Sequence, residues 1–224
     1  MVTLGIIGVV SAMTVPTLMQ NHQRKTYVTQ LRKIYSEVSQ GLILYQTQNN
    51  AVNLKEAGIN SVESAVEFVK STFKVIADCG SENAPCFAAN DEYKKLDGTT
   101  ITDERCASWH PCLALANGAS VSVNYAGGSP LFQLILDING QNGPNIAGRD
   151  FFSFYIYNNG VIDDLSTIDD KDNEYGWTCD PNIVAPLSQE LREKNFQRGC
   201  MSSSPQEWHG CFGKILNDNW EMTY

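Results

Sequence analysis

Five side chains that carry oxygen lie close together in one short segment of the chain. Asp137, Asn139 and Gln141 alternate, and Asn145 and Asp150 follow them. Calcium takes about six to eight oxygen ligands, so this spacing permits a calcium site. The segment lacks the glycine and the glutamate that an EF-hand loop has at its sixth and twelfth positions. The alternative, which we favour, is a hairpin turn whose Asn and Asp side chains hydrogen-bond to their own backbone. We therefore expect no cofactor, with calcium at this segment as the alternative.

Two His–X–Cys pairs offer a second kind of metal chemistry. They are His110-Pro-Cys112 and His209-Gly-Cys211, and two imidazoles with two thiolates can hold zinc tetrahedrally. Zinc ligand pairs usually have about two to five intervening residues, whereas these pairs have a single one. Cysteines in an oxidising compartment also form disulfides first. A secreted zinc enzyme is therefore a third alternative, behind the two functions given below.

The cysteines themselves predict disulfide chemistry. Seven cysteines in one chain favour an oxidising compartment. Their spacings suggest three short loops, each containing turn-forming residues, and the hypothetical pairs are Cys79–Cys86, Cys106–Cys112 and Cys200–Cys211. Connectivity does not follow from spacing alone. Cys179 is left over, either free or competing for Cys200.

No motif for covalent or acid–base catalysis stands out. A Cys–His pair would have to draw on His22, His110 or His209, and no Ser/His/Asp spacing, nucleophile elbow, phosphate loop or paired-carboxylate motif is present. We interpret the acidic residues between Asp163 and Asp172 as a solvated loop. The net charge of −9 disfavours general nucleic-acid binding, which needs a basic surface. We expect neither an enzyme nor a nucleic-acid-binding protein.

A long helix must position much of this chain. An apolar stripe with the 3–4 spacing of one helical face runs through Val28, Leu31, Tyr35, Val38, Leu42 and Tyr45. The amphipathic part, residues 20–50, can continue from an apolar run that precedes it. A helix over residues 3–50 would be about 70 Å long, so half of it must protrude from a small domain. Pro16 predicts a kink or local melting. An ordinary core helix would explain residues 28–45 but not the run before them.

The apolar run has no charged residue before Arg24. Its apolar surface comes from Leu4, Ile6, Ile7, Val9, Val10 and Val15. The run alone is too short for a membrane span of about 20 residues. A secretory signal peptide with a cleavage site at Ser11-Ala12 is the alternative. The bases that follow, Arg24, Lys25, Arg32 and Lys33, are suited to lipid headgroups or to acidic groups of a neighbouring subunit, or they form a solvated helix face.

The remainder, residues 51–224, predicts a single α+β head. Asn60 with Glu63 signals a helix start, and its apolar face is expected to include Val62, Ala65, Val66, Val69, Phe73 and Ile76. The chain from 77 to 118 looks loop-like. Alternating residues and turn signals predict strands over 119–125, 131–138 and 151–157. Successive strands with tight turns favour an antiparallel sheet, across which the long helix can pack.

Three stretches resemble the type IV pilins and type II secretion pseudopilins. The apolar run ends in a proline, Pro16, where that family has its helix-kinking proline. The segment DINGQNGPNIAGRDFFSF (residues 137–154) is similar to the pattern D-x-N-G-x-x-G-P-N-x-x-G-x-D-x-F-x-F of pilin-like proteins. The ending GCFGKILNDNWEMTY (residues 210–224) resembles their closing G-C-x-x-x-I-I-x-D-G-W-x-M-x-Y, with Asn219 where glycine is usual. The resemblance covers residues 1–45, 137–157 and 210–224.

The resemblance implies a structural role. In that family the first helix, here residues 1–19, anchors the subunit in the bacterial inner membrane and then packs in the core of an extracellular or periplasmic filament. Its partners are identical or related subunits, the inner-membrane assembly machinery and a prepilin peptidase. Some major pseudopilins hold calcium in their heads. The resemblance also predicts a basic leader and a glutamate upstream of Met1. The alternative function is a membrane-anchored extracellular binding or adhesion module.

Overall fold

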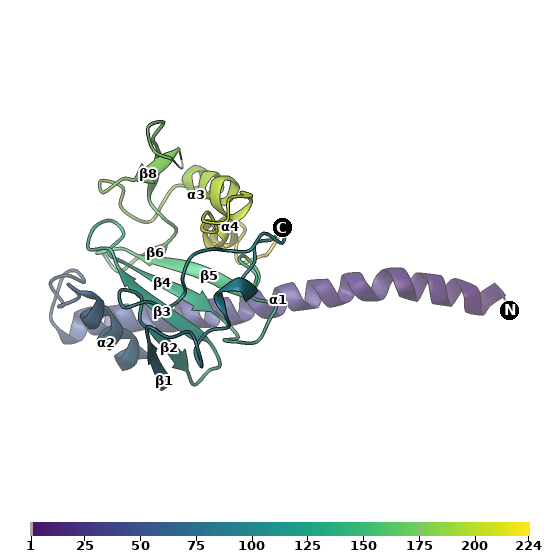
Figure 1. Ribbon diagram of the computed structural model, residues 1–224, viewed down its shortest axis with the longest axis horizontal. Coiled ribbons are helices and arrows are strands. Elements are labelled where there is room, and N and C mark those ends of the chain that lie inside the picture. Colours follow the sequence, from purple (N-terminus) through teal and green to yellow (C-terminus); the bar gives the residue numbers. More distant parts are fainter. Residues whose placement is uncertain (1, 175) are drawn as a thin grey trace.

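The computed structural model describes residues 2–174 and 176–224, and of residues 2–17 it describes the backbone only. Helix α1 (Val2–Gln48) is continuous, so the local melting expected at Pro16 is not seen. Figure 1 shows this helix running out of the head as a gently curved rod. The side chains predicted to form the apolar surface lie outside the described residues; they are those of Leu4, Ile6, Ile7, Val9, Val10, Val15 and Pro16. Within the described part of the chain, no helix combines the length and the apolar character needed to cross a membrane.

An antiparallel sheet forms the centre of the head. Its six strands lie in the order in which they occur in the chain, and they are β1 (Val75–Gly80), β2 (Cys112–Leu115), β3 (Ser120–Tyr125), β4 (Phe132–Asp137), β5 (Phe151–Ile156) and β6 (Ile162–Asp163). Strands β4 and β5 are buried on both faces. The sheet is therefore a middle layer, and each connection joins two neighbouring strands.

Smaller elements complete the head. Helix α2 (Val62–Thr72) packs on α1 and β3. A short ribbon of β7 (Thr167–Asp169) and β8 (Trp177–Cys179) projects from the head at the top of Figure 1. Helix α3 (Gln189–Asn195), a π-helical turn and α4 (Cys211–Asn217) follow in sequence. The head is thus an α+β structure with a long N-terminal helix.

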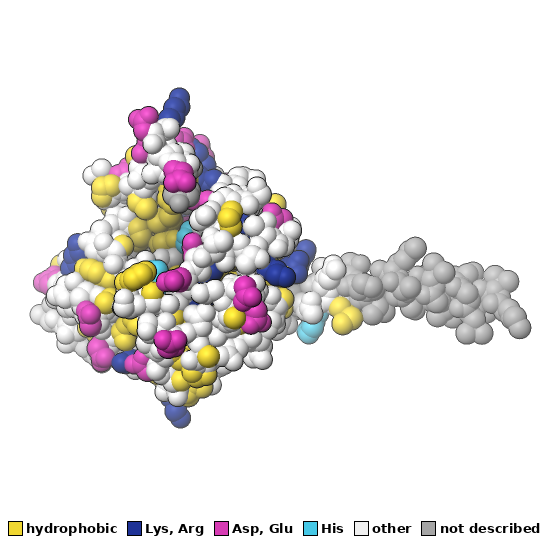
Figure 2. All heavy atoms as spheres, in the orientation of Figure 1, with side chains coloured by type: hydrophobic (Ala, Val, Ile, Leu, Met, Phe, Trp, Pro, Cys, Tyr) yellow, Lys and Arg dark blue, Asp and Glu magenta, His cyan; other side chains and the backbone are white. Residues whose placement is uncertain are grey.

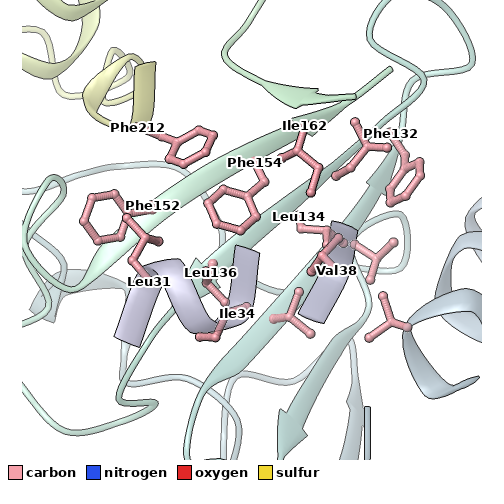
Figure 3. Close-up of a cluster of buried hydrophobic side chains, with 14 of the residues drawn as sticks. Leu31, Ile34, Val38, Phe132, Leu134, Leu136, Phe152, Phe154, Ile162 and Phe212 are labelled. Atoms are coloured by element: carbon pink, nitrogen blue, oxygen red, sulfur yellow. The ribbon is translucent and has the colours of Figure 1, made fainter. Parts of the chain in front are cut away.

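Helix α1 packs across one face of the sheet. Its residues Leu31, Ile34 and Val38 point toward alternate residues of β4 and β5, such as Leu134 and Phe154 (Figure 3). The 3–4 stripe is confirmed at Val28, Leu31, Val38 and Leu42, all of which are buried. Tyr35 and Tyr45 are half-buried, and Ile34 is an additional core residue. Burial of alternating strand residues against a helical stripe is the expected driving force for this layer.

Two predictions for the head are wrong. The segment 77–118 is not only loop, because it contains most of β1, the six-residue edge strand, and all of β2, its four-residue neighbour. Helix α2 is capped by Ser61, whose hydroxyl and that of Ser64 form a reciprocal capping box, rather than by Asn60 with Glu63. Ala65, Val66 and Val69 of its predicted apolar face are buried, together with Phe68, whereas Ile76 belongs to β1 and is exposed.

The acidic segment also differs from the prediction. Asp163 and Asp164 are buried, not solvated. Asp163 accepts two hydrogen bonds from the Arg192 guanidinium, at 2.7 and 2.6 Å, and one from the Leu187 N–H. Asp164 accepts from the N–H of Gly213 at 3.1 Å. These carboxylates fasten the C-terminal helices to the sheet, whereas the following acidic residues up to Asp172 remain largely exposed.

Candidate functional site

The first candidate site is the place where α1 leaves the head. Val28 is the first residue from Leu18 onward that is buried, with 7% exposure. Leu18 and Met19 are 66% and 59% exposed. Figure 1 shows the backbone of α1 leaving the head at this end. The described part of the rod therefore presents apolar side chains that the head does not cover.

The C-terminal segment braces the helix at its exit. Trp220 packs edge-on against Tyr35, with ring centroids 4.9 Å apart, and the Arg32 guanidinium lies 5.6 Å from the Trp220 ring. Asn219 and Trp220 both have left-handed backbone, with φ of 52° and 65°. Glycine adopts this conformation most readily, and asparagine, the residue at position 219, is among the residues that tolerate it.

A basic groove runs between the helix and this C-terminal segment. It has a volume of about 740 Å³ and is lined by all four predicted bases, Arg24, Lys25, Arg32 and Lys33. A second groove, of about 440 Å³, shares Arg24 and Met222 with the first and adds Arg149. Among the described residues, the one ion pair that involves the four helical bases joins Lys33 to Glu37 at 3.9 Å. Glu221 is the single acidic residue that lines the first groove, so the charge of its lining is net positive and suited to an external anionic group.

The predicted oxygen ligands are largely occupied by hydrogen bonds within the protein. Asp137 accepts from the Tyr93 hydroxyl at 2.8 Å and from the Asn139 N–H at 3.2 Å. Asp150 accepts from the N–H of Asn145 at 2.9 Å and from that of Ile146 at 2.7 Å. Burial raises the pKa of both carboxyls. This geometry is that of a self-bonded turn, the interpretation favoured above.

The side-chain amides of the same loop donate hydrogen bonds through their nitrogens. The Asn139 amide donates to the carbonyls of Asn142 and Gly143, at 2.6 and 3.1 Å, and the Gln141 amide donates to the carbonyl of Phe87 at 3.3 Å. The side-chain oxygens of Asn139 and Asn145 are both buried and have no hydrogen-bond partner among the described residues. Within the described ranges, no group of three or more His, Cys, Asp or Glu side chains is arranged to hold a metal. Calcium binding here stays a prediction.

The four-ligand zinc set is not assembled. Cys112 is bonded to Cys106, and Cys211 is bonded to Cys200, so neither sulfur is available as a thiolate. His110 and His209 nevertheless line one pocket on the face of the sheet opposite α1. The sequence therefore singles out two histidines that line the same pocket, but the cysteines beside them are in disulfides and cannot act as zinc ligands.

The three disulfides join the pairs that the spacing suggested. They link Cys79 to Cys86, Cys106 to Cys112 and Cys200 to Cys211, with Cα–Cα distances of 6.2, 5.5 and 5.1 Å. Cys179 is free and exposed on β8. Each disulfide closes a short loop of the chain. Cys79–Cys86 and Cys106–Cys112 hold segments that cover the sheet face opposite α1, and Cys200–Cys211 holds the C-terminal turn.

Comparison with known proteins adds no relative: no family model, no curated protein and no solved structure matches this chain.

Proposed function

We propose that this chain is a structural subunit, a pilin or pseudopilin, that polymerises through its N-terminal helix into a type IV pilus or a type II secretion pseudopilus. The observation that carries the proposal is that one part of α1 is packed in the head and another part is exposed. From Val28 to Leu42, α1 supplies core side chains, and before Val28 it presents Leu18 and Met19 uncovered. A helix of this kind can bury its remaining apolar surface in a membrane or against other copies, and removal of that surface from water favours association.

The basic grooves at the exit support the same proposal. Before assembly, Arg24, Lys25 and Arg149 would lie where anionic headgroups meet a membrane-inserted helix. After assembly, the same bases would face acidic side chains of a neighbour, since the chain carries a net charge of −9. The family resemblance of residues 1–45, 137–157 and 210–224 is the second support.

A charge placed in the apolar run tests the proposal. We expect Val10→Asp to abolish filaments, because a carboxylate in an apolar helix costs about 2.5–3.5 kcal/mol per subunit on insertion scales. The matched control is Val52→Asp, at a valine of the head that is 83% exposed. Both variants are expressed from the natural gene in the source cell, and filaments are counted by electron microscopy and by shearing.

Folding of the head is followed in parallel by its disulfides and its circular dichroism. We expect filaments from the unmodified chain and from Val52→Asp, and a folded head without filaments from Val10→Asp. Normal filaments from Val10→Asp, or none from the unmodified chain, would contradict the proposal.

A further inference from the structure

A pocket lies on the face of the sheet opposite α1. Its volume is about 350 Å³, within the range of about 300–1,000 Å³ that small-molecule sites occupy. Figure 2 shows histidine side chains among hydrophobic ones in the hollowed centre of this face. The pocket is separate from the helix exit, and the role proposed for α1 makes no use of it.

The floor of the pocket is a row of polar side chains from neighbouring strands. Asn124 of β3 is the register partner of Gln133 of β4, and Gln133 is the partner of Tyr155 of β5. The Asn124 amide donates to Gln133 at 3.3 Å, and the Gln133 amide donates to Ser153 at 2.7 Å and to Tyr155 at 3.2 Å. The Tyr155 hydroxyl lies 2.8 Å from Nδ1 of His209. This network fixes the floor in advance, which lowers the cost of ordering it around a ligand.

Two tryptophans form the walls. Trp208 is 2% exposed, and its indole N–H donates to the Asp103 carboxylate at 2.7 Å. Trp109 is 60% exposed, and its ring contacts the His110 ring edge-on with centroids 5.9 Å apart. An indole that stands exposed beside a pocket offers a flat apolar surface for a ligand to stack on.

One polar atom of the lining has no partner. Nδ1 of His110 is buried and has no hydrogen-bond partner among the described residues. A buried polar atom left unpaired is destabilising, so such atoms are usually satisfied. Because Nδ1 has almost no surface open to water, a ligand hydroxyl in the pocket would meet the other ring nitrogen of His110, which donates or accepts according to the tautomer.

The charges around the pocket favour a neutral ligand. Asp103 and Glu104 line it and disfavour an anion. Arg105 lies behind Trp208, 5.7 Å from the ring centroid, and its buried guanidinium has no hydrogen-bond partner within the described chain, so a cation is disfavoured as well. Burial lowers the pKa of His209 to about 3 and also lowers that of His110. Both imidazoles are therefore uncharged near neutral pH.

We propose that this pocket binds a neutral saccharide. Its hydroxyl groups would hydrogen-bond to the amides of Asn124 and Gln133 and to His110, and an apolar face of the sugar ring would stack on Trp109. Amides and neutral imidazoles can each donate and accept, which suits hydroxyl groups that do the same. The proposal concerns the head alone and does not depend on whether α1 forms filaments.

The test measures binding of four defined neutral probes to the full chain: methyl β-glucoside, methyl β-galactoside, methyl α-mannoside and diacetylchitobiose. Saturation-transfer NMR and calorimetry are the readouts. We expect at least one probe to bind saturably with a millimolar Kd. Trp109→Ala and Asn124→Ala should each weaken that binding at least tenfold. The control is Ile76→Ala, on strand β1, where the side chain is 65% exposed and the affinity should not change.

Three outcomes would overturn the proposal. In the first, none of the four probes binds. In the second, binding is the same in Trp109→Ala and Asn124→Ala as in the unmodified chain, which would place the sugar elsewhere. In the third, choline or acetate binds in a Trp109-dependent way and the saccharides do not, which would assign the pocket to a charged ligand. Circular dichroism of each variant confirms that the head is folded, and Asn124→Asp is the second variant at the floor if Asn124→Ala does not fold.

Discussion

Two adjacent acidic residues of the head are held in different ways. Asp163 faces the Arg192 guanidinium in a two-point contact. Asp164 faces only backbone N–H groups, of Leu165 at 2.7 Å and of Gly213 at 3.1 Å. Burial is the main cause that raises the pKa of Asp164 from 3.8 to about 7. The Arg192 guanidinium thus offsets the cost of burying the charge of Asp163, whereas the backbone N–H groups offset only part of that cost for Asp164.

Asp164 predicts how stability varies with pH. Because its folded pKa lies above its unfolded pKa, the folded protein binds the proton more tightly. This contribution to the free energy of unfolding is complete below about pH 4 and is lost as the pH rises through about 7, at about 1.4 kcal/mol for each pKa unit of difference. In Asp164→Asn we expect this decline to disappear. Urea unfolding at pH 4.5 and pH 8 measures it.

The control for this prediction is Asp172→Asn, at an exposed residue of the same acidic segment. Its stability should follow the pH in the same way as that of the unmodified chain. If Asp164→Asn keeps the full decline between the two pH values, another buried acid is responsible; the pKa values of Asp137, Asp150 and Glu207 are also raised by burial.

At the scale of elements, helix α1 has a buried stripe and an exposed side. Leu42 is fully buried, whereas Leu44, two residues later, is 55% exposed. We expect Leu42→Ala to lower the free energy of unfolding by about 2–5 kcal/mol and Leu44→Ala to change it by less than about 0.5 kcal/mol. Because both variants replace leucine by alanine, a difference between their free energies of unfolding in urea reports how deeply each position is buried. Equal losses would mean that the helix packs in another register.

The sequence predicts the elements that repeat a pattern over several turns or strands. The stripe of α1 and the alternation in β3, β4 and β5 are visible because each apolar residue faces the same layer. Strands β1 and β2 were missed because β2 has only four residues, and because β1 lies at the sheet edge with two register shifts. Burial of Asp163 depends on Arg192, which is distant in sequence, so local composition indicated solvent instead.

The same reasoning applies to the two candidate sites. The bases at the helix exit could be named from the sequence because they are close together on one helix. The pocket could not, because its floor requires the register of three strands, and His209 reaches it from the C-terminal segment. The sequence offers His110 and His209 as zinc ligands only as an alternative, and the disulfides that it also suggests for Cys112 and Cys211 already disfavour that set. Nothing in the spacing indicates that the two histidines line one pocket.

At the scale of the whole molecule, the head should be separable from the rod. The core begins at Val28, so deletion of residues 1–22 leaves every buried residue of the described chain in place. We expect a soluble monomer in size-exclusion chromatography with light scattering. Deletion of residues 1–36 is the contrasting variant, because it also removes Val28, Leu31 and Ile34 from the core and should destabilise the head. Aggregation of the shorter deletion would show that the division is wrong.

The path of α1 also has a mechanical consequence. A pull on the protruding part would travel through one continuous helical backbone into the middle of the head. It would load the contacts of Leu31, Val38 and Leu42 with the sheet in shear, all at the same time, instead of peeling them apart one by one. No cysteine lies between Val2 and Gln48, so no disulfide clamps this helix to the sheet. Resistance to extraction under load therefore rests on noncovalent side-chain contacts, which include this packing and the hydrogen bond from the Asn117 amide to Glu37 at 3.5 Å, and on no disulfide.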